Sequence, residues 1–178
     1  MAAAYTVYAY AIPALHALGI GHSATAWILS AYGLGAIGGN LAAGIAADRV
    51  GPTRVLTTGY LLMVATMAAF AVLAAAHVHA PALVALLAIT WGASTWCQTP
   101  PQQHRLFTAA PAEAPLLMAL NASAIYVGIG IGTASGGLLI GSGATRMFVV
   151  AALIACAALA WLAATRNKNH RVCTTLAR

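Results

Sequence analysis

The sequence predicts an all-α membrane protein built as a bundle of six transmembrane helices, and two observations support that prediction. Charged residues make up only 6% of the chain and hydrophobic residues 62%, whereas a soluble domain carries roughly a quarter of its residues as charges. The charges also leave four long stretches uncharged, at residues 1–47, 55–104, 114–145 and 147–165. Because a helix needs about 20 apolar residues to cross a bilayer, these stretches hold six crossings with lipid as their solvent.

The boundaries of the six helices follow from turn-forming residues and from charges. The first stretch divides at Gly19–Ser23 and the second at His77–Pro81, where glycine or proline interrupts the apolar run. Arg146 separates the last two helices. Strands are not expected, because a membrane barrel alternates over short segments of about 10 residues, while these runs are long and rich in alanine and leucine. The resulting spans, to within a few residues, are 2–19, 24–46, 54–76, 82–99, 116–141 and 147–165.

The basic residues predict an orientation. Residues 1–165 form the bundle and residues 166–178 a basic tail, so six crossings place both termini on one side of the membrane. Seven of the eight basic residues fall on that side and only Arg146 on the other. Since cytoplasmic segments are enriched in Lys and Arg, both termini and the tail are expected in the cytoplasm. The basic residues are scattered over loops without a stacking platform, which argues against nucleic-acid binding.

The connection between the second and third helices combines an acid, two arginines and two turn formers, and reads GIAADRVGPTR from position 44. Gly44 lets a neighbouring backbone approach closely, and Gly51 with the proline after it reverses the chain. Asp48 can accept hydrogen bonds from Arg49, from Arg54 or from a helix N-terminus. Taken alone, the segment could also be an ordinary interfacial loop with cytoplasmic arginines.

The pattern G-x-x-A-D-R-x-G-x-x-R closely resembles the loop signature of the major facilitator superfamily, which occurs between helices 2 and 3 and again between helices 8 and 9. Three further segments, Tyr5–Pro13, Trp91–Pro100 and Leu120–Ser123 with the glycines after it, look like the C-terminal half of drug- and sugar-efflux members. The resemblance covers nearly the whole chain and aligns its helices with helices 7 to 12. It implies half of that fold, an efflux transporter in a bacterial-type inner membrane, and a gating role for the loop motif.

Two departures from the family pattern bear on function. A complete member encloses its cavity between two six-helix bundles, whereas this chain supplies one, and the first helix begins at Met1 without a polar flank, as if inside a longer helix. The expected partner is an N-terminal six-helix half or a second copy. A fragment, a misassigned start and a genuine half transporter are all open. A truncated membrane subunit that only packs with a partner is the second functional hypothesis.

The fifth helix carries a stripe of glycines that predicts close helix packing. Gly128, Gly132 and Gly136 recur at every fourth position, with Gly137 beside them. Small residues at that spacing let membrane helices approach each other closely. The same smooth face would also let helices rock against each other, as alternating access requires.

Polar and aromatic residues inside the predicted spans are the candidates for a solute cavity. On the fourth helix they follow the spacing i, i+3, i+4, i+7 and so form one stripe. A face that mixes aromatic and hydrogen-bonding groups suits an amphipathic or weakly polar solute, and drugs, sugars and amino-acid derivatives all fit. The alternative is that the hydroxyls bond backbone carbonyls and the aromatics lie at the lipid interface. The candidates are Tyr5, Tyr8, Trp91, Ser94, Thr95, Gln98, Asn121 and Tyr126.

An enzyme, a metal centre and a cofactor are not expected. Gly141-Ser142-Gly143 superficially resembles the serine turn of rhomboid-type proteases, but no histidine lies on the sixth helix to activate Ser142. The three cysteines are far apart and form no C-x-x-C pair. No acid lies inside the six spans, so a proton-driven assembly would need its coupling carboxylate in the other half.

Overall fold

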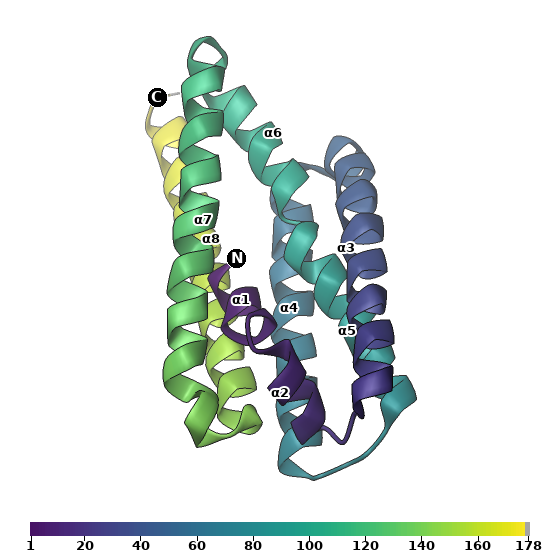
Figure 1. Cartoon of the computed structure of the whole chain (residues 1–178). Helices are drawn as coiled ribbons and strands as arrows, with labels where there is room; N and C mark the ends of the chain where they lie inside the picture. The colour runs from purple at the N-terminus through teal and green to yellow at the C-terminus, as the bar shows by residue number, and fades with distance from the viewer. Residues whose placement is uncertain (177–178) are drawn as a thin grey trace.

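A computed structural model describes the backbone of residues 1–176 and the side chains of residues 1–165. Over those residues the chain is helical apart from short turns, which confirms the all-α prediction (Figure 1). The predicted tail at 166–178 lies outside the described side chains. The elements are α1 (Ala2–Tyr8), α2 (Ala11–Ala17), α3 (His22–Val50), α4 (Pro52–Ala75), α5 (Pro81–Trp96), α6 (Thr99–Ala109), η1 (Pro111–Glu113), α7 (Ala114–Leu139), η2 (Ile140–Ser142) and α8 (Ala144–Leu176).

Four helical stretches among the described residues are long and apolar enough to cross a membrane. They are His22–Val50, Pro52–Ala75, Pro111–Ser142 and Ala144–Thr165. Large apolar side chains on these helices face outward, including Leu41, Leu138 and Leu153. A water-soluble monomer rarely exposes so much contiguous apolar surface, so the outer face of the bundle suits lipid.

The first predicted helix, 2–19, is divided into two short helices, which corrects the expectation of one continuous helix. The break lies between α1 and α2 at Ala9–Tyr10, where Tyr10 has φ −122° and ψ 31°. Pro13 explains it, because proline has no N–H to bond the carbonyl four residues back, that of Ala9, and its ring crowds that carbonyl. The path therefore bends at the break before it continues toward the loop at Gly19.

The region after the fourth predicted helix is also helical, where a connection between helices was expected. α5 ends at Trp96, and after a turn α6 runs from Thr99 to Ala109. Pro100 and Pro101 occupy the first turn of α6, where backbone N–H groups need no partner within the helix. Together α5 and α6 form one interrupted path along the height of the bundle (Figure 1).

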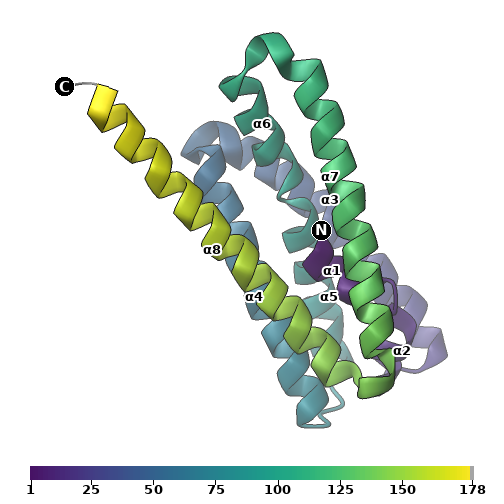
Figure 2. The same ribbon diagram turned by 90° about the vertical axis from the view of Figure 1, so that its left-hand side faces the viewer.

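The helices pair in a regular way. α3 packs most extensively against α5, α4 against α8, and α1 against α7, and Figure 2 shows α8 lying along α4. If the first triplet (α1–α2, α3, α4) is exchanged with the second (α5–α6, α7, α8), the pair α1·α7 becomes α5·α3 and the pair α4·α8 is unchanged. α1 and α5 run in opposite directions (Figure 1), so the exchange also inverts the triplet, as in inverted-topology repeats.

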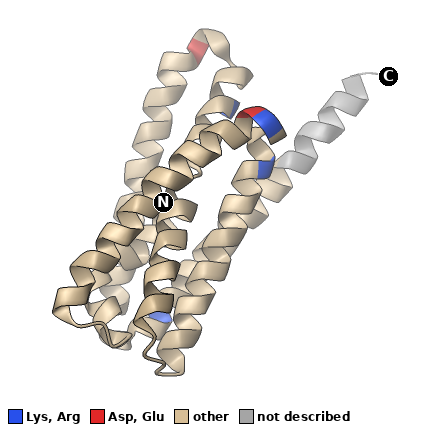
Figure 3. Cartoon of the chain, turned by 90° about the vertical axis from the view of Figure 1, so that its right-hand side faces the viewer, with Lys and Arg blue, Asp and Glu red and all other residues tan. Residues whose placement is uncertain are grey.

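The described charges lie at the two ends of the bundle (Figure 3). Asp48, Arg49 and Arg54 lie where α3 meets α4, and Arg105 and Glu113 lie near the end where α6 leads into α7. These connections are at the same end, which we call the charged end. Arg146, in the first turn of α8, lies at the opposite end.

Candidate functional site

The GIAADRVGPTR segment is almost wholly helical. The sequence suggested a connection over 44–54, but α3 continues to Val50 and α4 begins at Pro52. No residue from 44 to 50 interrupts a helix, so the reversal falls on Gly51 alone, with φ +91° and ψ 144°. This backbone region is essentially restricted to glycine. The Gly51 N–H still donates to the carbonyl of Ala47 at 3.1 Å, which ends α3 in an orderly way.

The charged residues of the motif face outward. Asp48 and Arg49 lie in the last turn of α3 and Arg54 in the first turn of α4, and all three side chains are exposed. Arg49 lies near the negative end of the α3 dipole, which favours a cation there. Gly44 faces inward, toward α6, where an added Cβ would lie 4.0 Å from the Pro100 Cβ. The motif therefore joins a packed inner side to a charged outer side.

The polar stripe on α5 lies mostly inside the bundle. Trp91, Ser94 and Thr95 are buried. The hydroxyls of Ser94 and Thr95 donate to the Trp91 carbonyl at 3.0 and 2.8 Å. Gln98, which follows the end of α5, donates through Nε2 to the Ser94 carbonyl at 2.8 Å. These hydrogen bonds occupy the side chains of Ser94, Thr95 and Gln98 on backbone carbonyls of the same stretch, and Gln98 also lines a cavity.

An aromatic cluster brings together three of the predicted cavity residues. The Tyr8 ring lies 5.4 Å from that of Tyr5 and 5.9 Å from that of Trp91, measured between centroids. Tyr32 of α3 completes the cluster, with its ring 4.8 Å from Tyr8 and 4.9 Å from Trp91. Tyr8 is 37% exposed and forms the open edge. The Tyr32 hydroxyl and the Trp91 Nε1 are buried without a hydrogen-bond partner among the described residues.

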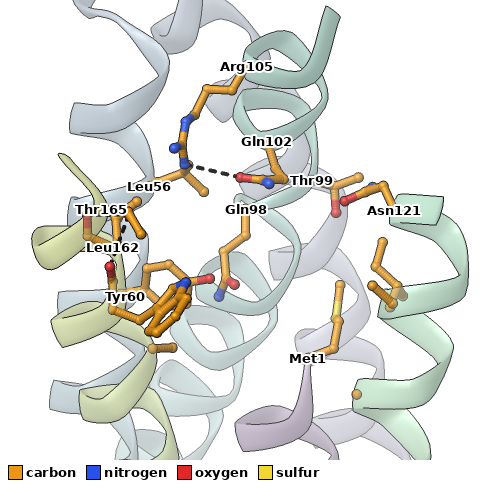
Figure 4. A pocket seen from close by; sticks show the side chains of 15 residues that line it. Met1, Leu56, Tyr60, Gln98, Thr99, Gln102, Arg105, Asn121, Leu162 and Thr165 are labelled. Atoms are coloured by element: carbon orange, nitrogen blue, oxygen red, sulfur yellow. Dashed lines mark hydrogen bonds between the residues drawn. The ribbon is translucent and has the colours of Figure 1, made fainter. Parts of the chain in front are cut away.

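A polar cavity of about 400 Å³ lies between α4, α6, α7 and α8, next to Met1 (Figure 4). Two of the predicted cavity residues line it, Gln98 and Asn121, as does Gly128 of the glycine stripe. Arg105 also lines it, and its Nη1 donates to Gln102 Oε1 at 3.3 Å. The other polar side chains on its wall are those of Tyr60, Thr99, Trp161 and Thr165.

Sequence reasoning missed several residues of these two sites. Gln102 and Arg105 lie four and seven positions after Gln98, which is the spacing of one helix face. Extending the helical pattern past the two prolines would have found them. Tyr32 and Tyr60 offer no such signal, because each is a single aromatic residue in an apolar helix. Tyr126 joins neither site, since it is 73% exposed on α7 and is not on the cavity wall.

The glycines of α7 form the surface on which α1 packs. A Cβ added at Gly132 would overlap the Ala2 carbonyl, and one at Gly136 would overlap the Thr6 carbonyl. Gly128 lies beside Met1 and Gly137 beside the Tyr10 hydroxyl. The equivalent pair α3·α5 has the same construction, which the sequence pattern did not predict. There, added Cβ atoms at Gly35, Gly39 and Gly92 would meet the backbone of the facing helix.

The chain matches the family described as Major Facilitator Superfamily over residues 1–175, nearly its full length. The chain belongs to the Major Facilitator Superfamily. Over 150 residues it is 31% identical to the inner membrane transport protein YdhP of Escherichia coli K12. That similarity covers 83% of this chain but 37% of the relative, so the chain spans well under half the length of the relative. No solved structure matches the chain.

Members of this superfamily are membrane transporters rather than enzymes, and the chain is accordingly a multi-pass membrane protein. The superfamily assignment agrees with the position of the loop motif in the fold. The motif turns the chain between α3 and α4, which are consecutive members of one triplet. Its outward charges lie at the charged end of the bundle.

Proposed function

We propose that the chain is the C-terminal half of a secondary-active transporter and works by alternating access with a second six-helix half. The pairing of its helices is the observation that carries this proposal. Swapping the two triplets converts the pair α1·α7 into the pair α3·α5 and leaves the pair α4·α8 unchanged. Three-plus-three inverted repeats are the internal plan of each half of a major facilitator transporter. One such unit is what this chain supplies.

Six crossings are expected of such a half. The four long apolar stretches supply four of them, and the interrupted path α5–α6 supplies a fifth. α1–α2 begins midway along the bundle (Figure 1) and provides the part of the sixth crossing farther from the charged end. By the excess of basic residues, the charged end faces the cytoplasm of a bacterial-type inner membrane, and both termini belong to that side. The relative YdhP is itself described as an inner membrane transport protein.

Each part of the site has a proposed role. Asp48, Arg49 and Arg54 form contacts with the other half at the charged end and so stabilise one conformation, with Gly44 and Gly51 shaping the segment. Tyr8, the open edge of the cluster that it forms with Tyr5, Tyr32 and Trp91, offers an aromatic face to an amphipathic solute, while the Tyr32 hydroxyl and the Trp91 Nε1 lie buried behind it. Ser94, Thr95, Gln98 and Asn121 support that surface or the polar cavity, and Tyr126 faces outward toward lipid or the other half.

Proton-coupled efflux completes the proposal. The described helices hold no acid away from the charged end, because Asp48 and Glu113 both lie there. A carboxylate that takes up a proton within the membrane must therefore come from the partner half. The α7 glycines provide a smooth contact on which α1 can rock as the halves alternate.

The test is reconstitution of the purified chain with the N-terminal six-helix half of YdhP. Liposomes loaded with a pH-sensitive dye are given ethidium, an aromatic cation, or arabinose, a sugar. We expect solute-driven proton movement with both halves present and none with either half alone. Equal flux from the chain alone would support a homodimer instead. Stable co-purification with no flux for either solute would contradict transport and support a subunit that only packs with its partner.

A further inference from the structure

An apolar groove of about 310 Å³ runs between α3 and α4, with the end of α5 as its floor. It exists because α3 and α4, although joined by Gly51, pack mainly on other helices, α3 on α5 and α4 on α8. Most of its wall is glycine, alanine and short aliphatic side chains. The lining residues are Gly39, Ala42, Ala43, Ala46, Val50, Arg54, Val55, Thr58, Gly59, Leu62, Ala93 and Cys97.

The length of the groove matches one leaflet of a bilayer. Along α3 it extends from Gly39 to Val50, which is about 16 Å at a rise of about 1.5 Å per residue. The hydrocarbon core is about 30 Å thick, so one leaflet contributes about 15 Å of acyl chain. A single lipid tail would therefore fill the groove from the charged end to near the middle of the membrane.

The polar atoms in the groove leave only one group for a ligand. The Thr58 hydroxyl donates to the Arg54 carbonyl at 3.1 Å, and the Cys97 thiol donates to the Ser94 carbonyl at 3.4 Å. Arg54 is the only charged side chain on the wall, and it is exposed at the charged end of the groove. A guanidinium matches the oxygens of a phosphate with two parallel hydrogen bonds.

We propose that this groove binds an anionic phospholipid, with an acyl chain between α3 and α4 and the headgroup phosphate on Arg54. Basic pockets between transmembrane helices on the cytoplasmic side are suited to anionic headgroups. The pairing of an apolar slot one leaflet deep with a cation at its mouth has the two-part chemistry of a lipid. A helix of a partner half would need the slot but not the cation. Arg54 also belongs to the proposed gating motif, but lipid retention is measured on this chain alone, so a failure of the lipid site is distinguishable from a failure of transport.

The test is native mass spectrometry of the purified full chain, titrated with dioleoylphosphatidylglycerol and with dioleoylphosphatidylcholine. We expect the wild type to retain the anionic lipid preferentially. Arg54→Gln should weaken its retention about fivefold, since one basic residue contributes about 1 kcal/mol near anionic lipid, and Arg54→Lys should restore part of it. Arg105→Gln, which removes a charge at the same end outside the groove, should leave retention unchanged.

A second variant tests the slot rather than the charge. Ala46→Phe should fill the groove and weaken retention of both lipids, whereas Ile45→Phe, on the neighbouring exposed face, should not. Unchanged retention in Arg54→Gln or in Ala46→Phe would overturn the proposal, as would an equal loss in Arg105→Gln. Displacement of the bound lipid by the N-terminal half of YdhP would also overturn it, because the groove would then be a helix-docking site.

Discussion

At the scale of single residues, Gly51 sets the geometry of the charged end. It is the only non-helical residue between α3 and α4, and its φ of +91° is one that a side chain would strain. With the reversal confined to one residue, Asp48 and Arg54 are held on adjoining helix ends rather than on a loose loop. Exposed charges on rigid helix ends are suited to docking against a second rigid body.

Asp48 is the motif residue whose replacement should affect transport most. In the complete assembly, Asp48→Asn keeps the shape of the side chain but removes the charge that the proposed contact between halves uses. We expect solute flux to be abolished or to lose its regulation. Glu113→Gln is the matched control, because it neutralises the other acid of the chain, at the same end but outside the motif. Flux measured in proteoliposomes at equal protein abundance that stays normal in Asp48→Asn would rule out the gating role.

The α5 stripe shows how far residue patterns predict a site. The spacing of Trp91, Ser94 and Thr95 correctly indicates one helix face, but it does not say what that face meets. In the structure this face meets α4, where the Met63 sulfur lies 3.7 Å from the Ser94 hydroxyl. Such contacts depend on helices far apart in the sequence. Tyr32 belongs to no sequence pattern, and it joins the aromatic cluster because α3 packs against α5.

At the scale of elements, long apolar runs were predicted well and interruptions less well. The helices at 24–46, 54–76 and 116–141 reappear as α3, α4 and α7 with slightly different ends. The differences occur at prolines. Pro13 interrupts a predicted helix, while Pro100 and Pro101 begin one where a connection was expected. Proline is tolerated in the first turn of a helix but interrupts the interior of one. Its effect therefore depends on where the helix begins, and the sequence leaves that position ambiguous.

The contact between α1 and α7 can be tested with two glycines on one helix. Gly132 has no room for a Cβ because the Ala2 backbone lies against it, whereas the space beside Gly130 is open. Gly132→Leu should therefore separate the two helices and destabilise the bundle by about 1–3 kcal/mol, the usual cost of overpacking. Gly130→Leu should have little effect.

Thermal unfolding of both variants in detergent, followed by tryptophan fluorescence, measures this difference. The midpoint should fall in Gly132→Leu relative to Gly130→Leu. Equal midpoints would mean that α1 does not pack on the α7 glycine face. Because both variants add the same side chain to the same helix, a change in helix propensity alone cannot produce the difference.

At the scale of the whole molecule, the inverted arrangement of the two triplets is the feature that sequence patterns did not predict. Its helix pairs join segments that are far apart in the sequence, such as α1 and α7. Both exchangeable pairs, α1·α7 and α3·α5, use glycines four residues apart on the exchanged helices, Gly132 and Gly136 on α7 and Gly35 and Gly39 on α3. The symmetry therefore lies in the packing of backbones, which similar small residues permit without a recognisable sequence repeat.

The charge distribution predicts the orientation of the whole molecule. Arg49, Arg54, Arg105 and Glu113 lie at the charged end and Arg146 at the other, and basic residues are retained on the cytoplasmic side. In a background with the cysteines replaced by serine, Ala112→Cys in η1 and Ser142→Cys in η2 place single thiols at opposite ends of α7. In intact cells with a permeable outer membrane, a membrane-impermeant maleimide should label Ser142→Cys without disruption of the inner membrane.

Ala112→Cys should react with the maleimide only after the inner membrane is opened. The reverse pattern would mean that the termini face outward. Labelling of both sites in intact cells would mean that the long helix α7 does not cross the membrane, and the six-crossing topology would fail with it. The same maleimide test on Thr108→Cys, near the end of α6, applies to the interrupted path α5–α6. That path begins at the end opposite the charged end (Figure 1), so Thr108→Cys should stay protected in intact cells if the path completes a crossing.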